Sequence, residues 1–109
     1  MAMQGPDFKQ QFVDPAPASN ADVGRTIAHL MQLDTHDKGQ LIGRVLFEAL
    51  PNGATPAVTS RVLMSEPAAN GLATVLNIQM VGDTRYFDAA GFPGRTVGLS
   101  TTPLPTAAE

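Results

Sequence analysis

The chain has 109 residues, a net charge of −3 at pH 7 and no cysteine. This length is enough for one domain with one modest core, and the lack of thiols excludes disulfides and cysteine-held metal ions. The basic residues are scattered singly, which excludes the electrostatic footprint of a nucleic-acid-binding protein. No apolar run approaches the roughly 20 residues of a membrane helix, and the N-terminus lacks the apolar core of a signal peptide. Charged residues make up only 16% of the sequence, against a usual share of about 25%, so we expect a partner to cover part of the surface.

Residues 1–20 are predicted to form an extended N-terminal arm, because their prolines interrupt regular structure and favour extended conformations. About 20 extended residues span roughly 65 Å, whereas a domain of this size has a radius of gyration of about 13 Å. The arm can therefore reach a neighbouring protein and add to its sheet as a strand. The alternative is a disordered terminus with incidental phenylalanines. The candidate partner-binding residues are Phe8, Phe12, Val13, Pro15 and Pro17.

A short helix is predicted over residues 21–33. Its apolar residues recur at helical spacing on one face. These residues are Val23, Ile27, Leu30 and Met31. Ser19 or Asn20 is suited to cap the N-terminus of the helix. The sequence DTHDKG is expected to end it, with Gly39 in a left-handed turn.

From residue 40 onward the apolar residues alternate with a period of two, which is typical of strands separated by turns. The expected strands cover residues 40–50, 57–65, 71–82, 84–88 and 95–99. We therefore predict a mainly β (α+β) protein, a small antiparallel β-meander that forms a barrel or sandwich, with one short helix and an extended N-terminal arm. In this organisation residues 21–100 form a single β-rich domain and residues 101–109 a C-terminal tail.

The first hairpin of this meander has two possible registers. A two-residue loop at Asn52 and Gly53 would place two arginines directly opposite each other, which is unfavourable. A longer loop over residues 52–57 pairs Glu48 with Arg61 instead, and this register is the one predicted. The second face of the strands is only half polar, so it is buried either inside a barrel or sandwich or against another subunit.

The best candidate for a metal site combines Asp34, His36 and Asp37, with His29 one helical face away. Imidazole and carboxylate groups would suit zinc or another divalent ion. The spacing of the two histidines matches no common ligand pattern, and aspartates are also favoured in the turn after a helix. We therefore expect a structural turn and no metal site.

The sequence indicates no enzyme. No serine lies in a G-x-S-x-G context, and the glycines of AAGFPGR do not form a phosphate-binding loop. We predict no catalytic residue and no cofactor. Exposed aromatics on a β scaffold can bind carbohydrates or other small ligands. Possible surface contacts of this kind are Arg85, Tyr86 and Phe92, although a tyrosine at a strand edge has a purely structural explanation as well.

The layout resembles the small head-decoration, or cement, proteins of tailed bacteriophages, of the lambda type. The matching stretches are DPAPASN in the arm, LMQLDTHDKGQLIGRV at the entry to the body and GDTRYFDAAGFP late in the chain. The likeness covers most of the length and lies in the architecture. It implies a structural virion protein that stabilises a phage head through its N-terminal arm and an oligomeric β-rich body, with no catalytic residues.

The resemblance further implies the major capsid protein as partner and a homo-oligomer, most simply a trimer. It implies a location on the capsid surface of the virion, with assembly in the host cytoplasm. No nucleic acid and no membrane is expected as a partner. Two other functions stay open from the sequence: a small inhibitor or adaptor that binds one protein, and a ligand-binding β module.

Overall fold

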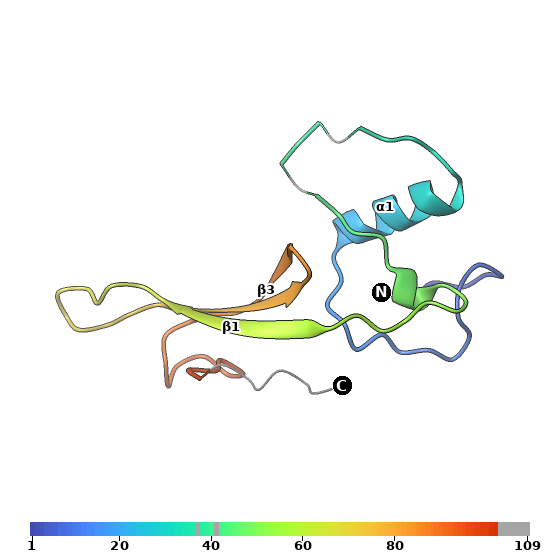
Figure 1. The fold of residues 1–109 in the computed structure, drawn as a ribbon. Coiled ribbons are helices and arrows are strands. Elements are labelled where there is room, and N and C mark those ends of the chain that lie inside the picture. The colour runs from blue at the N-terminus through green and yellow to red at the C-terminus, as the bar shows by residue number, and fades with distance from the viewer. Residues whose placement is uncertain (37, 41, 103–109) are drawn as a thin grey trace. The chain divides into compact units, whose positions relative to one another are not determined.

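The computed structural model describes residues 1–36, 38–40 and 42–102 (Figure 1). Contacts within the chain group it into two compact units, Met1–Pro56 and Ala57–Glu109. The described part of the first unit contains the helix α1 (Asn20–Leu30) and the 3₁₀ helix η1 (Phe47–Ala49), and that of the second contains the strands β1 (Val58–Met64), β2 (Val75–Val81) and β3 (Thr84–Gly91). The predicted α+β, β-rich class with one short α-helix is confirmed. Neither described helix has the length and apolar character needed to cross a membrane.

Helix α1 lies where the sequence predicts it, one residue earlier at its start and three residues earlier at its end. Ser19 is the N-cap, and its N–H donates to Asp22 Oδ2 at 2.9 Å, as in a capping box. The helix ends at Leu30, Met31 is its C-cap, and the left-handed residue that follows is Gln32, with φ of 54°. The expectation that Gly39 takes this conformation is wrong, because its φ lies outside the left-handed region.

The buried face of α1 is polar rather than apolar. Asp22 and Thr26 are fully buried, whereas Ile27 is 46% exposed on the face predicted to be the core. Thr26 Oγ1 donates to the carbonyl of Asp22 at 2.7 Å and accepts the N–H of Leu46 at 2.9 Å. The helix is therefore held in its unit by satisfied polar groups as well as by Ala28 and Leu46.

The strand predicted over residues 40–50 is wrong for the described part of that segment, which forms irregular chain followed by η1. Residue 41 lies outside the described residues. The N–H groups of Arg44 and Leu46 donate to the side chains of Asp22 and Thr26 on α1, so they are not available for a ladder. The segment has the alternating apolar pattern of a strand. It forms no strand because side chains of α1, about 20 residues earlier, accept its main-chain N–H groups.

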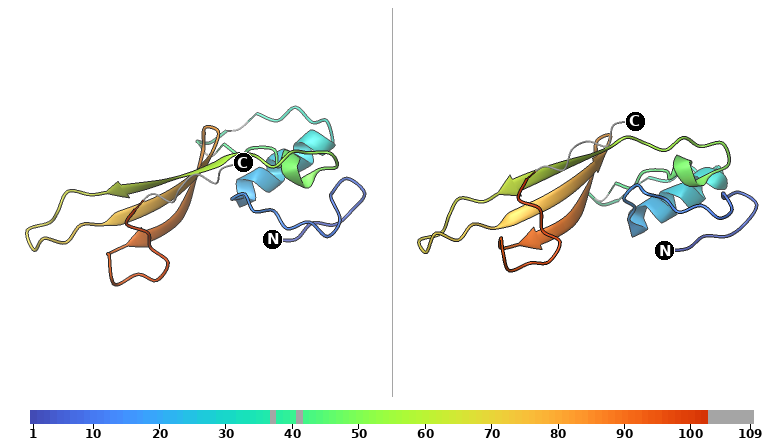
Figure 2. Two further views of the ribbon diagram at one scale, coloured as in Figure 1. Left: turned by 60° about the horizontal axis from the view of Figure 1, so that its bottom comes forward. Right: turned by 90° about the horizontal axis from the view of Figure 1, so that it is seen from below.

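The three strands form one antiparallel sheet in the order β1-β2-β3 (Figures 1 and 2). β1 pairs with β2 from Val58↔Val81 to Met64↔Val75, and Arg61 lies opposite Ile78. The predicted pairing of Arg61 with Glu48 is therefore wrong. Within the described residues β1 and β3 are the two edges of the sheet, and closure into a barrel or a second sheet is not seen.

β2 and β3 form a hairpin around Gly82, whose φ of 57° suits the tight turn. A β-bulge interrupts their register, because Asn77 pairs with Ala89 and Ile78 with Phe87, which leaves Asp88 as the extra residue. The predicted strand over 84–88 is thus the first part of β3. The strand predicted over 95–99 is wrong, since turns occupy that stretch, with Gly98 in the left-handed conformation.

The sheet of the second unit has a covered face and a more exposed face, although Ile78 on the exposed face is itself only 5% exposed. The covered face carries Val75, Asn77, Val81 and Tyr86, all 9% exposed or less. The chain that follows β3 turns back beside it (Figure 2), and the Asn77 amide bonds both main-chain groups of Ser100, at 2.7 and 2.8 Å. One buried asparagine therefore fastens the last described segment to the sheet.

Candidate protein-binding site

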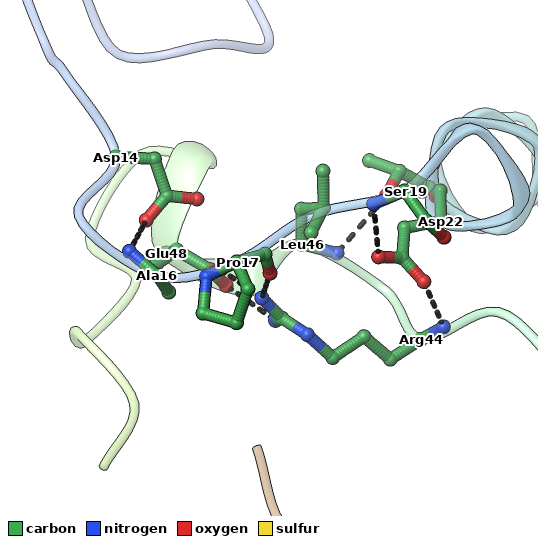
Figure 3. Close-up of polar contacts among 9 residues, drawn as sticks. Asp14, Ala16, Pro17, Ser19, Asp22, Arg44, Leu46 and Glu48 are labelled. Carbon is green, nitrogen blue, oxygen red and sulfur yellow. Dashed lines mark hydrogen bonds and ion pairs between the residues drawn. The ribbon is translucent and has the colours of Figure 1, made fainter. Parts of the chain in front are cut away.

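The base of the N-terminal arm is tied to the rest of the first unit by Arg44 (Figure 3). Arg44 Nη2 donates to the carbonyl of Pro17 at 2.9 Å and to Glu48 Oε1 at 2.6 Å, and Nη1 donates to Glu48 Oε2 at 3.0 Å. The side chain of Glu48 is only 2% exposed. This forked, charge-assisted arrangement is the strong form of an arginine–carboxylate pair. It joins the arm to the turn of η1.

A second carboxylate lies beside this pair. Asp14 accepts the N–H of Ala16 at 2.9 Å, and its carboxyl group is close enough to Glu48 for the two to interact electrostatically. Burial and the neighbouring Glu48 carboxylate raise the pKa of Asp14 above its ordinary value. Burial alone would also raise the pKa of Glu48, but its interactions with Arg44 and with its own main chain outweigh burial and lower the pKa. With the pKa of Asp14 raised and that of Glu48 lowered, Asp14 is the more readily protonated of the two.

The outer part of the arm folds back along the segment that contains η1. The N–H of Lys9 donates to the carbonyl of Ala49 at 2.9 Å, and its ammonium donates to the carbonyl of Gly53 at 2.7 Å. The same ammonium lies 4.7 Å from the centre of the Phe12 ring, in cation–π geometry. Gly53 permits a tight turn here, because a Cβ at this position would lie 1.7 Å from the carbonyl oxygen of Phe47.

The folded arm forms an apolar hollow of about 360 Å³ in the first unit. Phe8 and Phe12 are half-buried and line it together with Leu46 and Ala49. Val13 also lines the hollow but is 88% exposed, so it stands at the rim. The arm was expected to be extended and to reach a neighbouring protein, whereas its residues Phe8 to Val13 line a hollow within the first unit.

Two of the predicted arm contacts take no part in this hollow. Pro15 is exposed, and Pro17 is half-buried with its carbonyl held by Arg44. Pro17 therefore positions the arm. The structure brings together Phe8, Phe12 and Val13, and their role in binding stays a prediction.

The other predicted surface contacts are not brought together. Arg85 is exposed on one face of the sheet, whereas the adjacent Tyr86 is 9% exposed and belongs to the covered face. Phe92 follows the end of β3 and is 38% exposed. Tyr86 is a core residue in this fold, and the expectation that it offers a surface contact is not met.

The candidate metal ligands are also dispersed. His36 Nε2 lies 3.9 Å from Asp34 Oδ2, with both side chains about nine-tenths exposed (89% and 91%). His29 packs edge-on against the Phe47 ring, with the ring centres 5.0 Å apart. Asp37 lies outside the described residues. No group of three or more potential ligands occurs among the residues that the structure describes.

Sequence reasoning missed the residues that hold the arm: Asp14, Arg44 and Glu48. A usable signal existed, because Arg44 and Glu48 are four residues apart, which is the spacing of a helical ion pair rather than of a strand. The lining of the hollow is mainly apolar, and its two charged side chains already have partners, because the Lys9 ammonium donates to the carbonyl of Gly53 and Asp14 accepts the N–H of Ala16. Comparisons with models of protein families, with curated proteins and with solved structures found no significant match.

Proposed function

We propose that the protein is a structural virion protein, a head-decoration or cement protein of a tailed bacteriophage, that attaches to the major capsid protein through its N-terminal arm. The observation that carries this proposal is the apolar hollow lined by Phe8 and Phe12, with Val13 exposed at its rim. Aromatic residues in such a setting are the usual anchors of protein interfaces. The hollow accepts an apolar side chain of the capsid subunit.

The way in which the arm is held supports this role. Arg44 fixes the arm at Pro17, and Lys9 fixes it again at Ala49 and Gly53. A binding segment that is already ordered loses less conformational entropy on association than a free tail does. The arm therefore acts as a preorganised clamp on the partner, and a homotrimeric arrangement on the capsid surface would present three such clamps at once.

The test is occupancy on purified phage heads that lack the protein. Phe8→Ala with Phe12→Ala removes two aromatic groups, each worth roughly 1.5–3 kcal/mol when fully buried at an interface, and should weaken attachment at least a hundredfold. Val13→Asp tests the same site without touching a buried group, because Val13 is 88% exposed. Val97→Asp is the matched control, since Val97 is fully exposed and belongs to the other unit.

The isolated variants should retain their circular dichroism and their melting temperature within a few degrees. The heads should lose resistance to heating in step with lost occupancy. If both arm variants saturate the heads at the wild-type concentration, the arm is not the attachment site. If the wild-type protein does not bind heads at all, the decoration function is wrong.

A further inference from the structure

The exposed face of the sheet in the second unit is an apolar stripe. The side chains that alternate with those of the covered face come from all three strands and are mostly apolar. The stripe consists of the exposed Leu63 and Phe87, the half-buried Leu76 and Met80, and Ile78 at the centre, which is only 5% exposed. Phe87 is 77% exposed and Leu63 is 51% exposed. An aromatic residue this exposed in the middle of a strand is a feature of interaction surfaces.

Two arginines flank this stripe, one on each edge strand. Arg61 on β1 and Phe87 on β3 both lie opposite Ile78, whereas Arg85 on β3 lies opposite Met80. Both arginines are exposed, and neither side chain has an ion-pair or hydrogen-bond partner within the described part of the chain. The face therefore has positive charge on both sides of an apolar centre.

No carboxylate of the three strands balances this charge on the same face. Asp88 is the only acidic residue in the strands. It lies at the bulge and lines a small hollow that Arg61 also lines, but the described part of the chain shows no ion pair between Asp88 and either arginine. The complementary partner is thus one that brings its own carboxylates.

We propose that this face docks an amphipathic helix of a partner protein, with an apolar stripe flanked on both sides by glutamates or aspartates. Three strands spaced about 4.8 Å apart give a surface about 10 Å wide, which matches the diameter of a helix, about 10–12 Å. Strands of seven residues are about 23 Å long, which matches about 15 helical residues. This inference is independent of the arm and of the decoration function.

The charges argue against occupants from this chain itself. Two copies packed face to face would place four arginines around one apolar interface with no carboxylate between them, which is unfavourable. Helix α1 of a second copy offers no exposed carboxylate to the arginines, because its one acidic residue, Asp22, is fully buried. A separate acidic helix satisfies both the stripe and the arginines.

The test uses two labelled helical peptides of about 15 residues with the full-length protein. Both peptides have leucines at helical spacing, and the flanking residues are glutamate in one and lysine in the other. Fluorescence anisotropy should show that the glutamate peptide binds at least tenfold more tightly, with an affinity that falls as salt is added. Arg61→Glu with Arg85→Glu should reverse the preference, and Phe87→Ser should weaken binding at least tenfold.

Arg95→Glu is the matched control, because Arg95 is an exposed arginine outside the strands, and it should leave binding unchanged. The altered side chains are all exposed in the wild type, so circular dichroism should show unchanged folding. Equal binding of both peptides, or an affinity unaffected by the double arginine reversal, would overturn the proposal. Self-association that Phe87→Ser abolishes, without peptide binding, would identify a second copy as the occupant and would also overturn it.

Discussion

Arg44 closes a two-bond fork on Glu48, with Nη2–Oε1 at 2.6 Å and Nη1–Oε2 at 3.0 Å, and the Glu48 side chain is almost excluded from solvent. The same guanidinium also holds the carbonyl of Pro17. The ion pair of Arg44 and Glu48 therefore connects η1 with the base of the N-terminal arm. The stability of the first unit should depend on this pair more than on any exposed charge.

Arg44→Ala should lower the free energy of unfolding of the first unit by about 3–5 kcal/mol, because it leaves a buried carboxylate without its partner. Arg44→Met combined with Glu48→Leu should be much milder, since no charge is then left unpaired. Urea unfolding followed by circular dichroism measures both. Asp34→Ala is the control, because its contact with His36 is exposed, and it should leave the midpoint unchanged. A double variant as unstable as Arg44→Ala would contradict this account.

The pH dependence of stability should have two parts of opposite sign. The raised pKa of Asp14 means that the folded state binds this proton more tightly than the unfolded state, so stability increases as pH falls through that pKa. The lowered pKa of Glu48 means that its stabilisation is complete above the ordinary glutamate pKa and is lost as pH falls through the lowered value. The melting temperature should thus rise slightly from pH 7 toward the ordinary carboxyl range and then fall below about pH 4.

Asp14→Asn separates these two parts. The variant should lose the rise in mildly acidic solution and keep the loss in strong acid, because Arg44 and Glu48 remain. Differential scanning calorimetry across this pH range would show it. Identical pH profiles for the variant and the wild type would contradict the raised pKa of Asp14.

Two glycine-to-alanine changes should act in opposite directions. Gly53→Ala would place a Cβ 1.7 Å from the carbonyl oxygen of Phe47, so the turn would have to open and release Lys9, at a loss of about 2 kcal/mol or more. Gly24→Ala lies inside α1 with no atom within 4 Å of the new Cβ and should stabilise by about 0.5–1 kcal/mol. Chemical denaturation of the two variants side by side is the measurement. A neutral Gly53→Ala would show that this turn is easily remodelled.

Asn77→Ala should detach the last described segment from the sheet, because the buried amide makes both bonds to Ser100. A loss of about 1–3 kcal/mol is expected for the unsatisfied main-chain groups, together with faster proteolysis after residue 92. Ser100→Ala is the matched control, since its bonds to Asn77 come from the main chain and survive the change. Equal proteolysis rates in the two variants would contradict the role given to Asn77.

Much of the fold could be predicted from local patterns. Helix α1 has a capping residue and helical spacing, and β1, β2 and the start of β3 have clear alternation between turns. The segment over 40–50 has alternation of the same quality but forms no strand. Its N–H groups at Arg44 and Leu46 are taken by side chains 20 or more residues away, and no local pattern reports such contacts.

The candidate site was predictable in its composition and not in its shape. The apolar character of Phe8, Phe12 and Val13 already singled them out as contacts. That the arm folds back depends on Lys9 reaching Gly53, 44 residues later, and on Arg44 reaching Pro17, 27 residues earlier. Prolines indicate that the chain is extended but not which part of the protein it packs against. The hollow could therefore not be predicted from the sequence.

The use of α1 side chains as acceptors has a consequence for amide-proton exchange. The N–H groups of Arg44 and Leu46 belong to no helix or strand, yet Asp22 Oδ1 and Thr26 Oγ1 accept them at 2.8 and 2.9 Å. Their protection against exchange therefore lasts only while α1 stays docked, since exchange reports local opening. Slow exchange of these two amides, in an otherwise irregular stretch, would therefore show that α1 is docked against the segment that carries Arg44. This measurement needs no added label.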